Sequence, residues 1–183
     1  MLEHMALTEQ DLIAVQAAYP NSLVELRDGK IIIMSPSDGM SEAIAVRLIR
    51  RLANWVEPRK LGFVFSSSAG FRVPNGDVVA PDVSFVAKER MRIPPRHYGN
   101  AVPNLVVEIK SPSDRLSELE EKLNLLRSYG SQAAWLIDPD EQTVIVDAEG
   151  QEKCALTDAD VLELPGLLPG WSMRVSELWP EQL

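Results

Sequence analysis

The sequence has few of the residues that bind soft metals or form disulfides. One cysteine, Cys154, and two histidines, His4 and His97, occur among its 183 residues. A single cysteine excludes an intramolecular disulfide framework and favours a reducing compartment such as the cytoplasm. Zinc sites need clustered histidine and cysteine, so a metal in this chain would be held by oxygen, the ligand that Mg²⁺, Mn²⁺ and Ca²⁺ prefer.

Long apolar runs are also absent. No run approaches the ~18 apolar residues that a membrane span requires, and the first residues lack the basic and then apolar layout of a signal peptide. Residues 1–5, which end in a second methionine, resemble a vector-derived leader and are left out of the fold prediction. The length fits one domain, so residues 1–183 are expected to form a single domain with no membrane partner.

Charge is distributed unevenly along the chain. The net charge is −9, but eleven acids and two bases lie after residue 137, whereas residues 1–137 hold sixteen of each. Within this neutral part the bases cluster in two short stretches, residues 47–60 and 88–96. One interpretation is two solvated faces, and the other is a surface that contacts nucleic-acid phosphates. The second interpretation assigns phosphate contacts to Arg47, Arg50, Arg51, Lys88, Arg90, Arg92 and Arg96.

Hydrophobic periodicity predicts three helices, over residues 8–18, 41–57 and 115–129. Ser41 and Asp114 are expected to cap the second and third of them. Two β-rich runs flank Asp28-Gly29, which indicates a hairpin over residues 22–34. Further strands are predicted over residues 62–66, 70–73, 78–86, 105–109, 133–137 and 143–147. This order predicts an α/β (α+β) fold with a central mixed β-sheet flanked by helices and an N-terminal hairpin extension.

The C-terminal tail, residues 150–183, contains short apolar pieces broken by prolines and glycines. The pieces around Leu167, Leu168 and Trp171 are expected to pack either on the core or on a partner in a homodimer.

Two positions combine acidic side chains with apolar strands. Glu108 and Lys110 stand two residues apart at the end of the run 105–109, so they are expected to project from the same face. Asp82 follows Pro81 inside the run 78–86, and proline disfavours a central position in a sheet. Such breaks in strand preference are where function is expected.

The pair Pro81-Asp82 followed by Glu108-Ile109-Lys110 resembles the PD-(D/E)xK nuclease signature. The resemblance implies that Asp82, Glu108 and the carbonyl of Ile109 bind Mg²⁺ or Mn²⁺, and that Lys110 positions the attacking water. Glu42, one residue into the second helix, is the candidate for the further catalytic acid that such nucleases supply from their first helix. Its alternative role is an N-terminal acid favoured by the helix dipole.

A wider pattern extends this resemblance over nearly the whole chain. It comprises Ser35-Pro36, Ala80–Val83, Leu105–Asp114, Lys122, Tyr129-Gly130 and Ala134–Pro139, in that order. The pattern looks like the Uma-type family of restriction endonuclease-like proteins. The resemblance implies a restriction-endonuclease-like core and a Mg²⁺-dependent endonuclease that hydrolyses phosphodiester bonds of DNA. Lys122 resembles a family-typical lysine that faces the metal site or a phosphate, and its alternative is a solvated lysine between acids.

Two other functions remain open. The fold could be a non-catalytic nucleic-acid or protein-interaction module, in which Asp82, Glu108 and Lys110 form a buried ion network. In that case Lys110→Ala is expected to destabilise the fold by ~3–5 kcal/mol. The protein could also be a nuclease that depends on a partner for its target, because the sequence contains no separate DNA-reading module.

Overall fold

The computed structural model describes residues 6–181. Its larger sheet has the strand order β10-β9-β8-β7-β6-β3. Strands β7 and β8 are parallel and the other neighbours are antiparallel, so the sheet is mixed as predicted. The strands are β3 Gly62–Ser66, β6 Val83–Ala87, β7 Leu105–Ile109, β8 Ala133–Asp138, β9 Thr143–Ala148 and β10 Cys154–Leu156.

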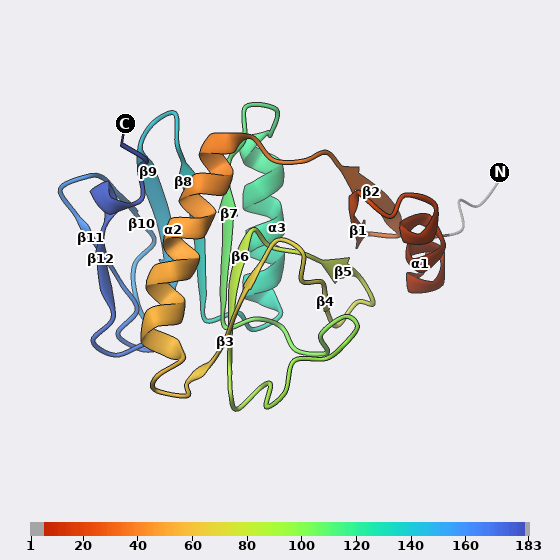
Figure 1. Ribbon diagram of the computed structural model, residues 1–183, viewed down its shortest axis with the longest axis horizontal. Coiled ribbons are helices and arrows are strands. Elements are labelled where there is room, and N and C mark those ends of the chain that lie inside the picture. Colours follow the sequence, from red (N-terminus) through yellow and green to blue (C-terminus); the bar gives the residue numbers. More distant parts are fainter. Residues whose placement is uncertain (1–5, 182–183) are drawn as a thin grey trace.

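Two helices cover the two faces of this sheet (Figure 1). Helix α2, Gly39–Val56, packs through Ile44 and Leu48 on the face that carries Val107. Helix α3, Leu116–Ser128, packs Leu126 on the opposite face, which carries Val106. Strand β7 is therefore buried on both sides, which explains why its sequence is a continuous apolar run rather than an alternating one.

A second, four-stranded sheet has the order β2-β1-β5-β4 and packs against α1, Glu9–Ala18. Its first two strands, β1 Leu23–Arg27 and β2 Lys30–Met34, form the predicted hairpin. Asp28 and Gly29 both have positive φ in the turn, which is the conformation that Asp-Gly favours between two strands. Figure 1 shows this sheet and α1 at one end of the molecule.

The single strand predicted over residues 78–86 is wrong. The chain forms β5, Val78–Val79, in the small sheet and then β6 in the large one, after β4, Phe71–Arg72. The break falls at Ala80-Pro81-Asp82, because proline has no N–H to donate to a ladder. Asp82 therefore lies where the chain crosses from one sheet to the other.

Both predicted helix caps are also wrong. Helix α2 is capped by Asp38, whose Oδ1 accepts hydrogen bonds from the N–H groups of Met40 and Ser41 at 2.8 and 3.0 Å. Asp114 does not cap α3, because its Oδ2 turns back to accept the N–H of Ser111 at 2.8 Å. This bond closes the loop between β7 and α3.

The C-terminal tail packs on the core. The hairpin of β11, Val161–Glu163, and β12, Ser172–Arg174, leads to the 3₁₀ helix η1, Val175–Glu177. Leu168 and Trp171 are buried in the same apolar cluster as α2. The Trp171 indole lies 5.8 Å from that of Trp135, and its N–H donates to the carbonyl of Arg51. In the described part of the chain no helix is long and apolar enough to cross a membrane.

We expect Trp171→Ala to lower the free energy of unfolding by about 3–5 kcal/mol, because it empties a large site in the core. Val161→Ala is the control in the same tail, since Val161 is 41% exposed and its loss should change stability by about 0.5 kcal/mol or less. Urea denaturation measures both. Equal effects would contradict the packing of the tail on the core.

Candidate nuclease site

A cleft of about 520 Å³ opens where the two sheets meet α3. Its walls come from the hairpin β1–β2, from the loop that precedes α2 and from the loop Ser111–Arg115. Six acids line it, and three of these come from the strands and the segment between the sheets: Glu25 from β1, Asp82 from the crossing segment and Glu108 from β7. We call this hollow the carboxylate cleft, after Glu25, Asp82 and Glu108.

The sheet places Asp82 beside Glu108. Val83 pairs with Val107 in the antiparallel ladder, so the residues that flank them are neighbours across the two strands. The Oδ2 atom of Asp82 accepts a hydrogen bond from the N–H of Ile109 at 2.7 Å. Glu108 is only 3% exposed. Asp82 and Glu108, the two acids of the PD-(D/E)xK signature, are therefore adjacent in space although they are distant in the sequence.

Lys122 reaches the same acids from α3. Its Nζ lies 2.8 Å from Glu108 Oε1 and 2.8 Å from Glu25 Oε1, and it donates to the carbonyl of Ala80 at 3.2 Å. Its side chain is 4% exposed, so its interpretation as a solvated lysine is wrong. The helix brings it there because Lys122 stands next to Leu123, which packs on the sheet.

Glu25 is the site residue that sequence reasoning missed. It is completely buried, its Oε1 also accepts the N–H of Ala80 at 2.6 Å, and its Oε2 lies 3.1 Å from Arg27 Nε. In the alternating run Leu23–Arg27 an acid and a base two residues apart suggest the solvent face of a hairpin. That face turns instead toward α3, and nothing in the sequence of the hairpin indicates this packing.

Lys110 does not join the carboxylates. Its Nζ lies 2.5 Å from Asp140 Oδ2 and 3.5 Å from Asp138 Oδ1, both at the end of the neighbouring strand β8. The hydrogen bond to Asp140 raises the pKa of Lys110. The expected network of Asp82, Glu108 and Lys110 is therefore replaced by one in which Lys122 supplies the cation.

Glu42 and the bases of α2 lie outside the cleft. Glu42 is exposed in the first turn of α2, and it is the neighbouring Ser41 that lines the cleft. Arg47 donates to the carbonyl of Glu177 in η1, and Arg51 pairs with the carboxylate of Glu177 at 2.9 Å. Arg50 is exposed. Two of these three bases thus contact the C-terminal tail.

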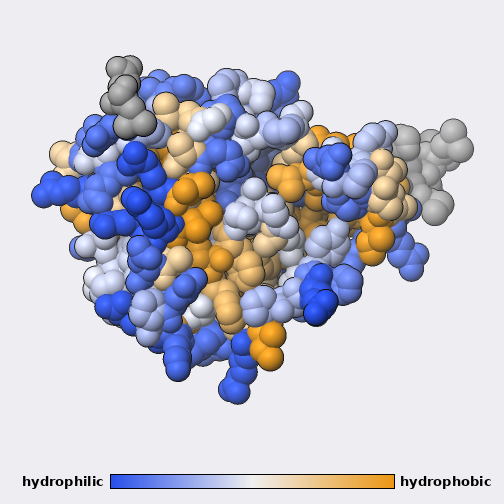
Figure 2. All heavy atoms as spheres, viewed as in Figure 1, coloured by the Kyte–Doolittle hydropathy of each residue, from blue (hydrophilic) through white to orange (hydrophobic). Residues whose placement is uncertain are grey.

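The outward surface of α2 is mixed in character. Met40 and Val46 are 49% and 60% exposed on this helix. Figure 2 shows apolar residues gathered in a strip down the middle of the face that α2 covers, with hydrophilic residues beside them. The helix therefore does not present a continuous basic surface.

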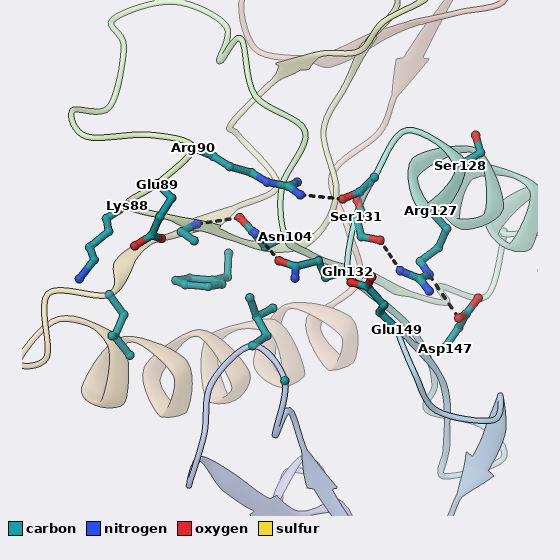
Figure 3. A pocket seen from close by; sticks show the side chains of 16 residues that line it. Lys88, Glu89, Arg90, Asn104, Arg127, Ser128, Ser131, Gln132, Asp147 and Glu149 are labelled. Carbon is teal, nitrogen blue, oxygen red and sulfur yellow. Dashed lines mark hydrogen bonds and ion pairs between the residues drawn. The ribbon is translucent and has the colours of Figure 1, made fainter.

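The second basic cluster lies at the opposite end of β6 from Asp82. Lys88, which follows β6, and Arg90 border another hollow, of about 980 Å³ (Figure 3). The strand of five residues separates this hollow from the carboxylate cleft by roughly 17 Å, at ~3.3 Å per residue. Arg92 and Arg96 are exposed in the loop that follows.

The polar groups of this second hollow hold loops together. Arg90 donates to the carbonyls of Val102 and Gly130 at 2.8 and 2.9 Å. Asn104 accepts the N–H of Ala87 and donates to Gln132 (Figure 3). Their hydrogen bonds join the start of β7 to the start of β8 and to the end of β6. They have a structural role here. Glu89, Asp147 and Glu149 also line this hollow, and Asp147 pairs with Arg127 at 3.2 Å.

Burial changes the proton affinities in the carboxylate cleft. Loss of hydration raises the pKa of Glu108 to about 8, although attraction to Lys122 opposes this shift. Burial also raises the pKa of Asp82, against the hydrogen bond from Ile109. Burial alone would lower the pKa of Lys122, but attraction to Glu108 and Glu25 outweighs it and the pKa is raised. Lys122 is therefore an ammonium ion in this site.

The oxygens of the cleft fit Mg²⁺ or Mn²⁺. Glu108 Oε1 faces Lys122 and Asp82 Oδ2 faces Ile109, which leaves a second oxygen on each carboxylate for a ligand in the cleft. Mg²⁺ binds through one or two carboxylates and keeps several waters or substrate oxygens. Within residues 6–181 no group of three or more His, Cys, Asp or Glu side chains is placed to hold a metal ion. The two carboxylates of Asp82 and Glu108 are as many as Mg²⁺ commonly takes from a protein.

Comparison with known proteins identifies the family. Residues 10–176 match the Uma2 family, described as "putative restriction endonuclease". The chain belongs to the Uma2 family. No curated protein matches the chain.

Solved structures support the fold. The chain is similar to the crystal structure of a "putative nuclease" from Anabaena variabilis, with a TM-score of 0.75 and 23% identity over 85% of this chain and 88% of that chain. This likeness confirms the expected nuclease-like fold. A more distant structure, a DrdV–DNA complex, has a TM-score of 0.41 and 14% identity over 81% of each chain.

We expect the two lysines to differ sharply in their contribution to stability. Lys122→Met leaves the completely buried carboxylate of Glu25 with only Arg27 as a charged partner, and should lower the free energy of unfolding by about 3–5 kcal/mol. Lys110→Met removes a pair whose acid, Asp140, is 66% exposed, and should cost less than about 1 kcal/mol. Urea denaturation at neutral pH measures both. A larger loss for Lys110→Met would contradict the assignment of the buried cation.

Stability should also depend on pH through Glu108. Its pKa is raised from 4.5 to about 8, so between these values the folded state binds more protons than the unfolded state. The free energy of unfolding should therefore fall as the pH rises through this interval. Denaturation curves of the parent and of Glu108→Gln, which lacks this proton, measure the difference. If the free energy of unfolding changed with pH equally in the parent and in Glu108→Gln over this interval, the result would count against a buried Glu108.

Proposed function

We propose that this Uma2 protein is a Mg²⁺-dependent endonuclease that hydrolyses phosphodiester bonds of DNA in the carboxylate cleft. The observation that supports this function best is the adjacent pair Asp82 and Glu108 with the ammonium of Lys122 2.8 Å from Glu108. Two carboxylates and one lysine are the groups that metal-assisted phosphodiester hydrolysis needs.

Each group has a definite role in this proposal. Asp82, Glu108 and the carbonyl of Ile109 hold the metal, which supplies an activated water and a Lewis acid when it is bound. Lys122 stabilises the negative charge that develops on the phosphate. It takes the place expected of Lys110, because the ammonium of Lys110 lies against Asp138 and Asp140. Glu42 has no role in it, since it does not line the cleft.

The DNA contacts follow from the exposed bases. Lys88 lies at the far end of β6, roughly 17 Å from the carboxylates, a distance that DNA covers in about five base pairs at ~3.4 Å per step, and Arg92 and Arg96 follow in the exposed loop. We assign them, with Arg50, to phosphates that flank the cut. Arg115 stands at the cleft itself and its side chain is 80% exposed. A homodimer would allow each copy to cut one strand of a duplex.

A non-catalytic module is the second candidate. It is favoured by the ion pairs of Lys122, which neutralise Glu25 and Glu108 without any metal. In this function the cleft would be a structural ion network and the exposed bases would bind nucleic acid. Cys154, which is exposed and free, fits a reducing compartment such as the cytoplasm in either case.

A nicking assay on supercoiled plasmid with Mg²⁺ or Mn²⁺ distinguishes the two functions. We expect the parent to cut, and Asp82→Asn and Glu108→Gln to lose on the order of 10²-fold or more in rate, because they weaken the metal site. Lys122→Met should lose about 10²–10⁴-fold. Lys110→Met is the matched control and should retain the rate of the parent within about threefold.

Folding of each variant is checked by circular dichroism. An inert parent with both metals and with both supercoiled and single-stranded DNA would contradict the nuclease proposal and favour the non-catalytic module. If Lys110→Met lost the cutting activity and Lys122→Met kept it, the catalytic lysine would be Lys110, as the sequence predicts.

A further inference from the structure

Glu25 enters the carboxylate cleft from a different sheet than Glu108. It comes from the hairpin, whereas Glu108 comes from the large sheet and Lys122 from α3. Its side chain has no exposed surface; Oε1 accepts the N–H of Ala80, and Oε2 lies 3.1 Å from Arg27 Nε without a hydrogen bond. A completely buried carboxylate is costly to desolvate unless it is paired or the site uses it.

One ammonium lies between two carboxylates in this arrangement. Lys122 Nζ is 2.8 Å from an oxygen of Glu25 and 2.8 Å from an oxygen of Glu108. A divalent cation that binds Glu108 repels Lys122 and competes with it for that carboxylate. Without a second partner the buried ammonium would lose its counter-ion, which costs several kcal/mol. Glu25 is the second partner.

Glu25 is itself held in place. Arg27 lies 3.1 Å from its Oε2, so the negative charge of Glu25 is partly offset even when Lys122 moves. Its Oε1 also accepts the N–H of Ala80, two residues before Asp82. The same carboxylate thus fixes the backbone that presents Asp82 and the lysine that faces Glu108.

We propose that Glu25 is a positioning residue that holds the Lys122 side chain beside the cleft while Glu108 binds a divalent cation. This inference rests on the proposed function, because it concerns the same metal site. Glu25 touches neither the cation nor the DNA, and acts through Lys122. The hairpin is thereby a necessary part of the site rather than an extension of the fold.

The test is the affinity for Mg²⁺ and for Mn²⁺, measured by calorimetry without DNA. Glu25→Gln keeps an oxygen that accepts the N–H of Ala80 but removes one charged partner of Lys122. Glu108 is then the sole charged partner of Lys122, so Mg²⁺ or Mn²⁺ must displace a tighter Lys122–Glu108 ion pair. We expect its Kd to rise by about tenfold. Glu118→Gln removes the same charge from an exposed residue that lines the cleft, and should change Kd by less than about threefold.

A double mutant shows whether Glu25 acts through Lys122. In the background of Lys122→Met no lysine competes for Glu108, so Glu25→Gln should then change Kd by less than about threefold. Glu25→Asp retains the charge but is one methylene shorter, and should weaken binding in the parent background because it cannot reach both Lys122 and Ala80. Circular dichroism and denaturation confirm that each variant is folded, and Glu25→Asp serves if Glu25→Gln does not fold.

Three outcomes overturn the inference. Equal losses for Glu25→Gln and Glu118→Gln would mean that general electrostatics accounts for the effect. Equal losses in the parent and in the Lys122→Met background would mean that Glu25 acts on the cation directly. A parent that binds neither cation would overturn the proposed metal site together with the inference, which separates this failure from the first two.

Discussion

The ammonium of Lys122 connects the hairpin, the large sheet and helix α3 through its ion pairs. It pairs with Glu25 of the hairpin and Glu108 of the large sheet, and it is carried by α3. Each partner alone would be an unpaired charge in a site with almost no solvent, and such a charge destabilises a fold strongly. The position of the small sheet and the composition of the cleft therefore depend on the same ion pairs.

The two hollows described above differ in how far their polar groups are already hydrogen-bonded. In the larger one, Arg90, Asn104 and Gln132 direct their hydrogen bonds to neighbouring loops. In the carboxylate cleft, Asp82 and Glu108 each keep an oxygen for a ligand. The first hollow has the greater volume, but the free carboxylate oxygens and raised pKa values of Asp82 and Glu108 favour the second as the candidate site.

The sequence indicates the central sheet, both flanking helices and the hairpin because each depends on local periodicity and turn chemistry. Asp82 and Glu108 were also identified, since an acid in an apolar strand is visible in the sequence. Glu25 and the orientation of Lys110 were not, because they depend on which elements pack together. The break at Pro81 was noticed as an anomaly in a strand, but the change of sheet that it produces is a property of the tertiary structure.

The crossing at Ala80–Asp82 has a consequence for the order in which the site is assembled. Its four charged groups, Glu25, Asp82, Glu108 and Lys122, come from separate segments of the chain, so the cleft exists only once the hairpin, the crossing segment, β7 and α3 have packed together. A nascent or partly folded chain can have its hairpin and α2 in place and still lack the cleft. In the nuclease that we propose, the catalytic groups would therefore come together only when the segment from Glu25 to Lys122 has folded.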